Sequence, residues 1–291
     1  MRTEARWWAL VTILLAGAGL LARGDQAPAG APVDYGSNPA AGHRVLCDDA
    51  NIYYEVYGSG KPLLLLHGGL FGYIDEFSEF IPELARQYQV IAVATRGHGR
   101  SEIGRQPLTY ERFARDAFAV LAQVTPEKAS VLGFSDGAIT TYAMALLHPE
   151  RLERVIAIGG GPLSFTDYTP QGIEEAGGLS GESLARALPD FVAGRKRLMP
   201  EPERWSEFVG RLKALYQSSV YLDREKLRTV AVPFLLVQGE HDPYASLETF
   251  VRLYRTFPRA QIAIVPGCGH LVLIERTQLA RELIRGFLSA P

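Results

Sequence analysis

Three side chains that together could activate a nucleophile occur along the chain in the order Ser135, Asp242 and His270. A serine hydroxyl is a poor nucleophile at neutral pH, so it needs a base within hydrogen-bonding distance, and that base needs a partner that fixes its tautomer. In such an arrangement Ser135 would attack a carbonyl carbon, His270 would take and return the proton, and Asp242 would orient His270. These residue types predict acyl transfer to water through a covalent intermediate.

The residues around Ser135 predict a turn that would expose its hydroxyl group. The apolar run 129–132 precedes the pentapeptide Gly-Phe-Ser-Asp-Gly at 133–137, and an apolar-rich helical pattern follows at 138–148. A strand, Gly-x-Ser-x-Gly and a helix form a nucleophile elbow, in which the sharp turn lifts the serine clear of the sheet edge. Glycine leaves room where strand and helix nearly touch. The short motif recurs by chance, so its prediction depends on this context.

The elements that must position these residues alternate between strands and helices through most of the chain. Residues 63–66 are consecutive leucines, typical of a strand buried on both faces of a parallel sheet. Further strands are predicted at 43–47, 52–57, 90–93, 129–132, 154–158, 232–237 and 261–265. Ser135, Asp242 and His270 each follow a predicted strand, and open α/β sheets bind ligands at the carboxyl ends of their strands. We therefore expect a mainly parallel, doubly wound sheet.

The alternation stops between about Leu163 and Val230. Residues 164–179 have the pattern of a loop, and one amphipathic helix, interrupted at Pro189, is predicted to follow. A second helix carries the apolar stripe Trp205, Phe208, Leu212, Leu215 and Tyr216. Because the strands on either side end at the catalytic edge, we expect a helical lid over Ser135 whose apolar residues line a hydrophobic acyl pocket. The alternative is that the stripe forms only the core of the lid itself.

The composition limits the classes of partner. The chain has 291 residues, 47% of them hydrophobic, and a formal net charge of -2. This size fits one large α/β domain, with or without a sizeable insertion, and the small charge does not indicate nucleic acid or an anionic membrane surface. Cys47 and Cys268 are the only cysteines, and an exported protein could pair them, so their pairing stays open. No Cys/His cluster has the spacing of zinc ligands, and the sequence implies neither a metal nor a cofactor.

The first residues have the pattern of an export signal. Arg2 and Arg6 precede the apolar run 7–21, which has the length of a signal-peptide core and is shorter than the roughly 20 residues of a membrane span. Residues 1–24 are therefore predicted to be a signal peptide with an approximate end, and the mature protein is expected to be periplasmic or secreted. An N-terminal membrane anchor is the alternative. Residues 25–41, rich in Ala, Pro and Gly, are predicted to be a disordered leader.

Between about Asn51 and Leu288 the chain resembles α/β-hydrolases of the large esterase, lipase and carbon–carbon hydrolase group. The resemblance depends on motifs at 67–69, 96–101, 133–137, 239–242 and 267–270, which read HGG, RGHGRS, GFSDG, GEHD and GCGH. The Ser-Asp-Gly elbow also resembles the esterase and amino-acid-ester hydrolase branch. Ala94 departs from the pattern, because many relatives carry an aspartate there, and we expect only local structural consequences. The resemblance implies an α/β-hydrolase core at 42–162 and 231–291 with a helical cap at 163–230.

The resemblance also implies roles for single residues. The spacing Gly-x-x-Asp selects Asp242 as the acid over Glu240, and the terminal Gly-x-Gly-His loop selects His270 as the base over His241. The oxyanion hole would consist of two backbone N–H groups. One belongs to Asp136, which follows the nucleophile. The other belongs to the loop after strand 63–66, with Gly69 expected and Leu70 as the alternative.

The expected function is that of a serine hydrolase that forms an acyl-enzyme and hydrolyses a small to medium apolar carboxylic ester. The alternatives are a carbon–carbon bond hydrolase or a lactonase with the same triad, and a binding or receptor-type member with little turnover. Arg96 and Arg100 are predicted to hold their loop, with binding of an anionic substrate as the alternative. The basic cluster 195–197 in the insertion is predicted to be solvated helix surface.

Overall fold

The computed structural model describes residues 33–290. The predicted signal peptide, residues 1–24, lies outside the described residues, and so does the first part of the predicted leader. Within the described range, none of the helices has the length and apolarity that a membrane span would require.

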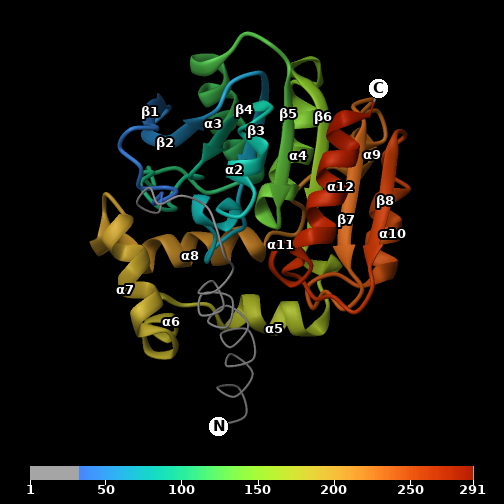
Figure 1. Cartoon of the computed structure of the whole chain (residues 1–291). Coiled ribbons are helices and arrows are strands. Elements are labelled where there is room, and N and C mark those ends of the chain that lie inside the picture. Colours follow the sequence, from blue (N-terminus) through green and yellow to red (C-terminus); the bar gives the residue numbers. More distant parts are fainter. Residues whose placement is uncertain (1–32, 291) are drawn as a thin grey trace.

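An eight-stranded sheet forms the centre of the molecule (Figure 1). The strand order is β1-β2-β4-β3-β5-β6-β7-β8; β2 pairs antiparallel with β1 and β4, and all other pairings are parallel. The strands are β1 Gly42–Cys47, β2 Ala50–Tyr57, β3 Lys61–Leu66, β4 Tyr88–Val93, β5 Ala129–Phe134, β6 Leu152–Ile158, β7 Phe234–Gly239 and β8 Ala260–Val265. This mainly parallel sheet confirms the predicted fold class.

Helices cover both faces of the sheet, and the leucines of β3 show why. Leu64 and Leu66 pack into the apolar cluster that includes α3 and α4, whereas Leu63 and Leu65 pack on the opposite face with α2 and α12. All four are fully buried, and burying each contributes about 1.5–3 kcal/mol relative to exposure. The helices outside the insertion are α2 Ile81–Leu84, α3 Tyr110–Val124, α4 Asp136–Leu147, α10 Leu247–Tyr254, α11 Val272–Glu275 and α12 Thr277–Ser289.

Between β6 and β7 the chain forms helices only. These are α5 Pro170–Gly178, α6 Gly181–Ala187, α7 Pro189–Leu198, α8 Trp205–Tyr216 and α9 Arg224–Leu227. Figure 1 shows α5 to α8 gathered beyond one end of the sheet. The helix predicted from the apolar stripe corresponds to α8, and most of that stripe is buried.

Two expectations for the insertion were wrong in detail. Residues 164–179, predicted as loop, contain α5, which begins where the Thr169 side chain accepts a hydrogen bond from the Gly172 N–H and where Pro170 occupies the first turn. The helix predicted to be interrupted at Pro189 is two helices, α6 and α7. Leu188 leaves the helical conformation, with φ -136° and ψ 57°, and Pro189 then starts α7. A side-chain cap sets the first boundary, and the backbone conformation of Leu188 before Pro189 sets the second. Apolar periodicity shows neither feature.

The end of the predicted leader is ordered against β2. The Glu55 carboxylate is fully buried and accepts hydrogen bonds from the backbone N–H of Gly36 at 2.6 Å and of Asn38 at 2.8 Å. The hydroxyls of Tyr53 and Tyr57 also donate to it, each at 2.7 Å. A buried carboxylate requires such donors, so the prediction of disorder up to residue 41 was wrong for these last residues.

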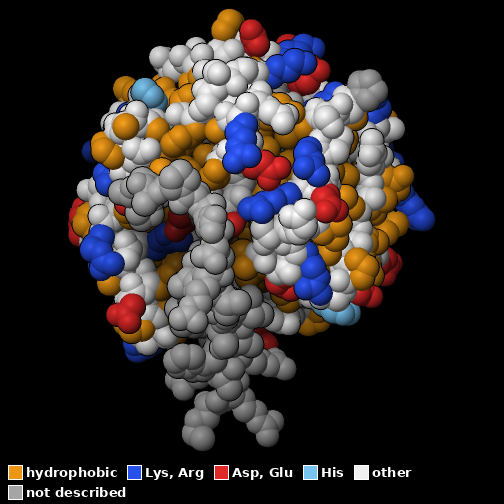
Figure 2. All heavy atoms as spheres, in the orientation of Figure 1, with side chains coloured by type: hydrophobic (Ala, Val, Ile, Leu, Met, Phe, Trp, Pro, Cys, Tyr) orange, Lys and Arg blue, Asp and Glu red, His pale blue; other side chains and the backbone are white. Residues whose placement is uncertain are grey.

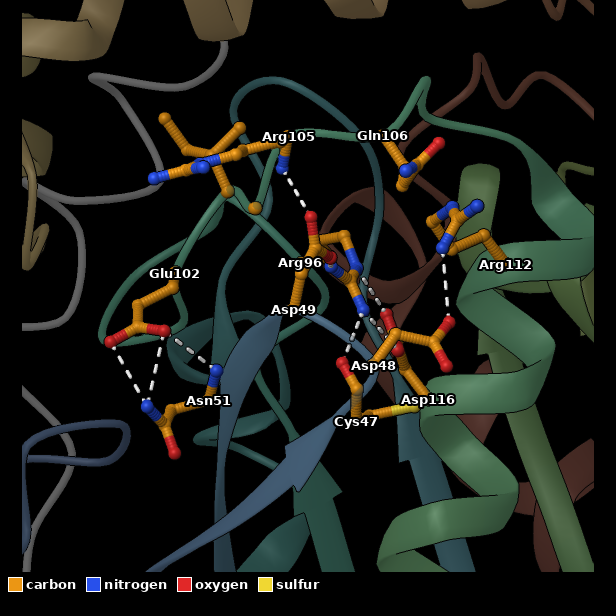
Figure 3. A network of polar contacts seen from close by, with 12 residues as sticks. Cys47, Asp48, Asp49, Asn51, Arg96, Glu102, Arg105, Gln106, Arg112 and Asp116 are labelled. Carbon is orange, nitrogen blue, oxygen red and sulfur yellow. Dashed lines mark hydrogen bonds and ion pairs between the residues drawn. The ribbon is translucent and has the colours of Figure 1, made fainter.

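Arg96 links the loop after β4 to two other elements (Figure 3). Its guanidinium is fully buried and donates to Asp116 of α3 at 2.7 and 2.8 Å and to Asp49 at 2.7 Å. It also donates to the Cys47 carbonyl at 3.0 Å. These contacts support the expected loop-holding role, and the guanidinium has no surface exposed to an anionic substrate.

The two cysteines are not paired. Cys47 lies at the end of β1 and Cys268 in the loop after β8, and both are free. On the face shown in Figure 2, basic and acidic side chains are interspersed without a broad area of one charge. Some of the charged side chains form surface ion pairs, for example Arg281 with Glu79 at 3.1 Å, and such exposed pairs are worth roughly 0–1 kcal/mol each.

Candidate active site

The turn after β5 holds Ser135 in an unusual backbone conformation. Its φ is 52° and its ψ is -116°, a region that costs a residue other than glycine about 1–3 kcal/mol. The fully buried β5 fixes one side of the turn, and α4 begins immediately after it at Asp136. A Cβ at Gly133 would overlap the Gly137 carbonyl, and a Cβ at Gly137 would overlap the Leu66 carbonyl. The predicted elbow is therefore present, and both of its glycines are sterically required.

The structure brings Ser135, Asp242 and His270 together from the ends of three strands. His270 Nε2 lies 3.0 Å from Ser135 Oγ, and His270 Nδ1 lies 2.8 Å from Asp242 Oδ2. The other Asp242 oxygen, Oδ1, accepts the Tyr244 backbone N–H at 2.9 Å. The Tyr244 ring also packs edge-on against the imidazole, with centroids 4.7 Å apart. The imidazole is thus fixed between a hydroxyl and a carboxylate.

The surroundings of His270 favour its protonated form. Burial by itself lowers the pKa of an imidazole, but the nearby carboxylates, with Asp242 first, together outweigh this effect, and the net pKa of His270 is raised above its ordinary value of 6.5. Glu76 and Asp136 add to the increase. A carboxylate that stabilises the imidazolium form of His270 favours proton transfer to it from the serine hydroxyl.

The two rival residues point elsewhere. The His241 side chain is 69% exposed, and its nearest ionisable partner is Glu240 at 3.8 Å. Glu240 accepts the Gly267 backbone N–H at 2.9 Å. Neither side chain takes part in the hydrogen bonds that join His270 to its partners.

The segments that carry the predicted oxyanion donors lie against each other. Asp136 is the first residue of α4, so its backbone N–H has no acceptor within that helix. A Cβ at Gly69 would overlap the Asp136 carboxylate and the Tyr216 hydroxyl. The loop turns tightly here, because the Gly72 N–H donates to the Gly69 carbonyl at 3.0 Å and Leu70 has a φ of 44°. Gly69, Leu70 and Asp136 all line one cavity with Ser135.

A family model described as the alpha/beta hydrolase family matches residues 63–282. The chain belongs to the alpha/beta hydrolase family. Membership confirms the resemblance inferred from the five motifs and makes the protein a hydrolase.

Individual relatives span most of the chain. A 2-hydroxy-6-oxo-6-(2'-aminophenyl)hexa-2,4-dienoic acid hydrolase of Metapseudomonas resinovorans is 26% identical, over 81% of this chain and 87% of its own length. The esterase YbfF of Escherichia coli is also 26% identical, over 79% of this chain and 94% of its own length. The crystal structure of carboxylesterase CesB from Bacillus subtilis is similar in fold, with a TM-score of 0.69, 21% identity and 99% of both chains covered.

The sequence did not predict a role for the side chains of two acids of the site, the buried Asp136 and the partly buried Glu76. Asp136 accepts the Tyr110 hydroxyl at 3.0 Å and the Tyr216 hydroxyl at 2.8 Å. Burial raises the pKa of Asp136 to about 6, although these hydroxyls stabilise its ionised form. Burial likewise raises the pKa of Glu76 to about 7, although the Gly68 backbone N–H donates to it at 2.8 Å. Asp136 directly follows the nucleophile, and this position is a signal that its side chain lies in the site. Glu76 belongs to no motif, so the sequence does not indicate that it lies there.

The cavity in front of Ser135 combines core and insertion residues. Its wall is largely apolar and aromatic. Besides His270, its acidic and basic side chains are the three acids Glu76, Asp136 and Glu175, and no lysine or arginine is among its described lining residues. The apolar part includes Phe71, Phe134, Ile139, Leu179, Tyr168, Tyr244 and Leu271. Of the predicted α8 stripe, only Tyr216 lines this cavity. The other stripe residues are buried in an apolar cluster that continues into the sheet core, and Phe208 packs edge-on against His98 with ring centroids 4.9 Å apart. The stripe is therefore neither the wall of this cavity nor a core of the insertion alone.

Proposed function

We propose that the protein is a serine esterase in which Ser135 is the nucleophile, His270 the general base and acid, and Asp242 the residue that orients His270. The proposal is supported above all by the two hydrogen bonds of the His270 ring, one to Asp242 and the other to Ser135. Three groups held in this order have the geometry that acyl transfer requires.

The hydrogen bonds imply one tautomer. The Asp242 carboxylate can only accept, so the proton of neutral His270 lies on Nδ1, and Nε2 is free to accept the Ser135 proton. Ser135 Oγ then bonds to the ester carbonyl carbon, and the carbonyl electron pair moves onto its oxygen. When the carbon–oxygen bond to the alcohol breaks, His270 returns the proton to the leaving alkoxide. Water, deprotonated by His270, releases the acid from the acyl-enzyme in the same way.

The backbone N–H groups of Gly69 and Asp136 are proposed to hold the oxyanion during both steps. Both residues line the cavity beside Ser135, and the two segments are in contact. One donor of this kind is worth about 2.7–4 kcal/mol of transition-state stabilisation. Residues 163–230 are proposed to be the cap that closes this cavity, with Tyr216 as one of its lining residues.

The cavity wall favours an uncharged small to medium apolar ester. Its apolar side chains suit an acyl chain, and the three acids, with no lysine or arginine among the lining residues, would repel an anionic group. The same charges argue against the substrate class named for the Metapseudomonas relative, because a dienoic acid would bring a carboxylate among carboxylates. An ester with a cationic amino group is a second candidate, favoured by Asp136 and by the resemblance of the elbow to amino-acid-ester hydrolases.

A panel of p-nitrophenyl esters tests the function and the charge preference together. We expect wild-type hydrolysis of neutral esters, with residual activity below about a hundredth in Ser135→Ala and no change in Ser289→Ala, an exposed serine at the end of α12. For Asp136→Asn at pH 8, the ratio of kcat/KM for an anionic ester to that for a neutral ester of equal length should rise. An unchanged ratio would contradict the charge argument, and a Ser135→Ala variant with substantial activity would contradict the function.

We further propose that the protein is exported after cleavage of its signal peptide. Arg2 and Arg6 before the apolar run 7–21 support this proposal. Mass spectrometry of the native protein should find a mature start between about Ala18 and Ala29. An intact Met1 or Arg2 would count against cleavage and leave the membrane anchor as the alternative.

A further inference from the structure

Two helices of the insertion contact the two segments that carry the proposed oxyanion donors. In α8, the Tyr216 hydroxyl donates to the carboxylate of Asp136 at 2.8 Å. In α7, Arg195 Nη2 donates to the backbone carbonyl of Phe71 at 2.9 Å, two residues after Gly69. The insertion is therefore bonded to both halves of the proposed oxyanion hole as well as lining the cavity.

Arg195 is not the solvated residue that the basic cluster predicted. Its side chain is 18% exposed, and its guanidinium forms an ion pair with Asp75 at 3.1 Å while it donates to the Phe71 carbonyl. The same group lies over the rings of Tyr73 at 5.3 Å and Phe191 at 4.9 Å. A planar guanidinium has donors in a fixed fork, so it can hold a carbonyl and a carboxylate at once and still stack on aromatic rings.

The loop that Arg195 holds is under backbone strain. Leu70 adopts the left-handed region with a φ of 44°, which a leucine adopts only when surrounding contacts require it. At the end of the loop nearer β3, the Gly68 N–H donates a hydrogen bond to Glu76. At its other end, the Phe71 carbonyl accepts one from Arg195. The Phe71 ring also packs edge-on against Phe191 of α7, with centroids 5.4 Å apart. Removing Arg195 would thus release one end of a strained loop whose middle carries the Gly69 N–H.

We infer that Arg195 is a positioning residue for the oxyanion hole, through which the α7 helix fixes the loop that carries Gly69. This inference rests on the proposed serine-hydrolase function. Since an oxyanion donor acts on the transition state and not on the bound ester, its displacement lowers kcat and kcat/KM together and leaves KM nearly unchanged. A residue that only shaped the acyl pocket would change KM instead.

The kinetic test compares Arg195→Ala, Arg195→Lys and Arg197→Ala on a neutral p-nitrophenyl ester. Arg197 is the matched control, because it is an exposed arginine on the same helix. We expect kcat of Arg195→Ala to fall about tenfold to a hundredfold, less than the 10²–10³ lost with a whole donor, with KM changed less than about threefold. Arg195→Lys should recover part of the loss, since an ammonium can still donate to the Phe71 carbonyl, and Arg197→Ala should match wild type.

Hydrogen–deuterium exchange of a peptide spanning residues 68–74 provides a readout independent of turnover. Exchange should be faster in Arg195→Ala than in wild type and Arg197→Ala, at a temperature where all three are fully folded. Unchanged exchange, a rise in KM alone, or a loss of kcat that merely follows a loss of folded protein would overturn the inference. If the wild type hydrolysed no ester, the proposed function would fail, but the exchange comparison would still decide whether Arg195 holds the loop.

Discussion

Replacing Asp242 by asparagine should reverse the tautomer of His270. Asp242 has two acceptor oxygens, of which Oδ1 receives the Tyr244 N–H and Oδ2 receives His270 Nδ1–H. The backbone N–H of Tyr244 can only donate, so an asparagine would turn its carbonyl oxygen to Tyr244 and its NH₂ group to His270. Nδ1 would then accept, the imidazole proton would move to Nε2, and Nε2 could no longer take the Ser135 proton.

The expected loss of kcat in Asp242→Asn is that of an enzyme whose general base is disabled while the positions of its side chains are kept. A carboxylate-to-amide change at this place in a Ser-His-Asp triad lowers kcat about 10⁴-fold, which corresponds to roughly 5.4 kcal/mol of activation free energy. The assay is kcat on a neutral p-nitrophenyl ester at pH 8. Glu240→Gln is the matched control, because it makes the same chemical change in the rival acid, whose bond to the Gly267 N–H an amide oxygen can keep. We expect this control to stay within about threefold of wild type.

Two results would refute the tautomer argument. An Asp242→Asn variant that kept more than about a tenth of wild-type kcat would show that His270 does not depend on a carboxylate at Nδ1. A loss in Glu240→Gln as large as that in Asp242→Asn would mean that the acid has been assigned to the wrong residue.

Three further predictions concern the base, the pH dependence and the stability. His270→Ala should lose as much activity as removal of the nucleophile, and His241→Ala should stay within about threefold of wild type; equal losses in both would withdraw the base assignment. Because the pKa of His270 is raised, kcat/KM should increase with pH through an apparent pKa above 6.5. A rise of kcat/KM centred below pH 6 would contradict this. Glu76 and Asp136 titrate in the same range, so the apparent pKa reports His270 together with these two acids. The same His270 shift stabilises the folded protein fully below pH 6.5, and this contribution is lost as the pH rises through the raised pKa. Arg96→Met should lower the free energy of unfolding in urea by about 3–5 kcal/mol, since the buried Asp116 carboxylate loses its partner, and a loss below 1 kcal/mol would contradict the buried-pair account.

Much of the core could be predicted because the apolar runs in the sequence match the burial of the strands in the fold. The run of four leucines at 63–66 is typical of a strand covered on both faces, and these four residues of β3 are fully buried. Ser135, Asp242 and His270 each follow a strand, and parallel strands bring their carboxyl ends to one edge, so sequence order was enough to place them together.

The rest depends on contacts between residues far apart in the chain. The ordered position of Gly36 and Asn38, at the end of the predicted leader, depends on Glu55, whose burial the sequence pattern of its strand does not reveal. The apolar stripe of α8 is equally compatible with a pocket wall and a small core, and only packing shows that Tyr216 alone reaches the cavity. Arg195 looks like one member of a solvated basic cluster until its contact with the Phe71 carbonyl, more than a hundred residues away, is seen.

The central claim is that Ser135 is an activated nucleophile, and covalent labelling with a fluorophosphonate measures this directly. The intact mass of the folded protein should increase by one phosphonyl group, and peptide mapping should place that group on Ser135. Labelling should be absent in Ser135→Ala and strongly slowed in His270→Ala, because Nε2 lies 3.0 Å from the serine oxygen and is the proposed proton acceptor. No adduct on the folded wild-type protein, or an adduct that persists in Ser135→Ala, would contradict the claim.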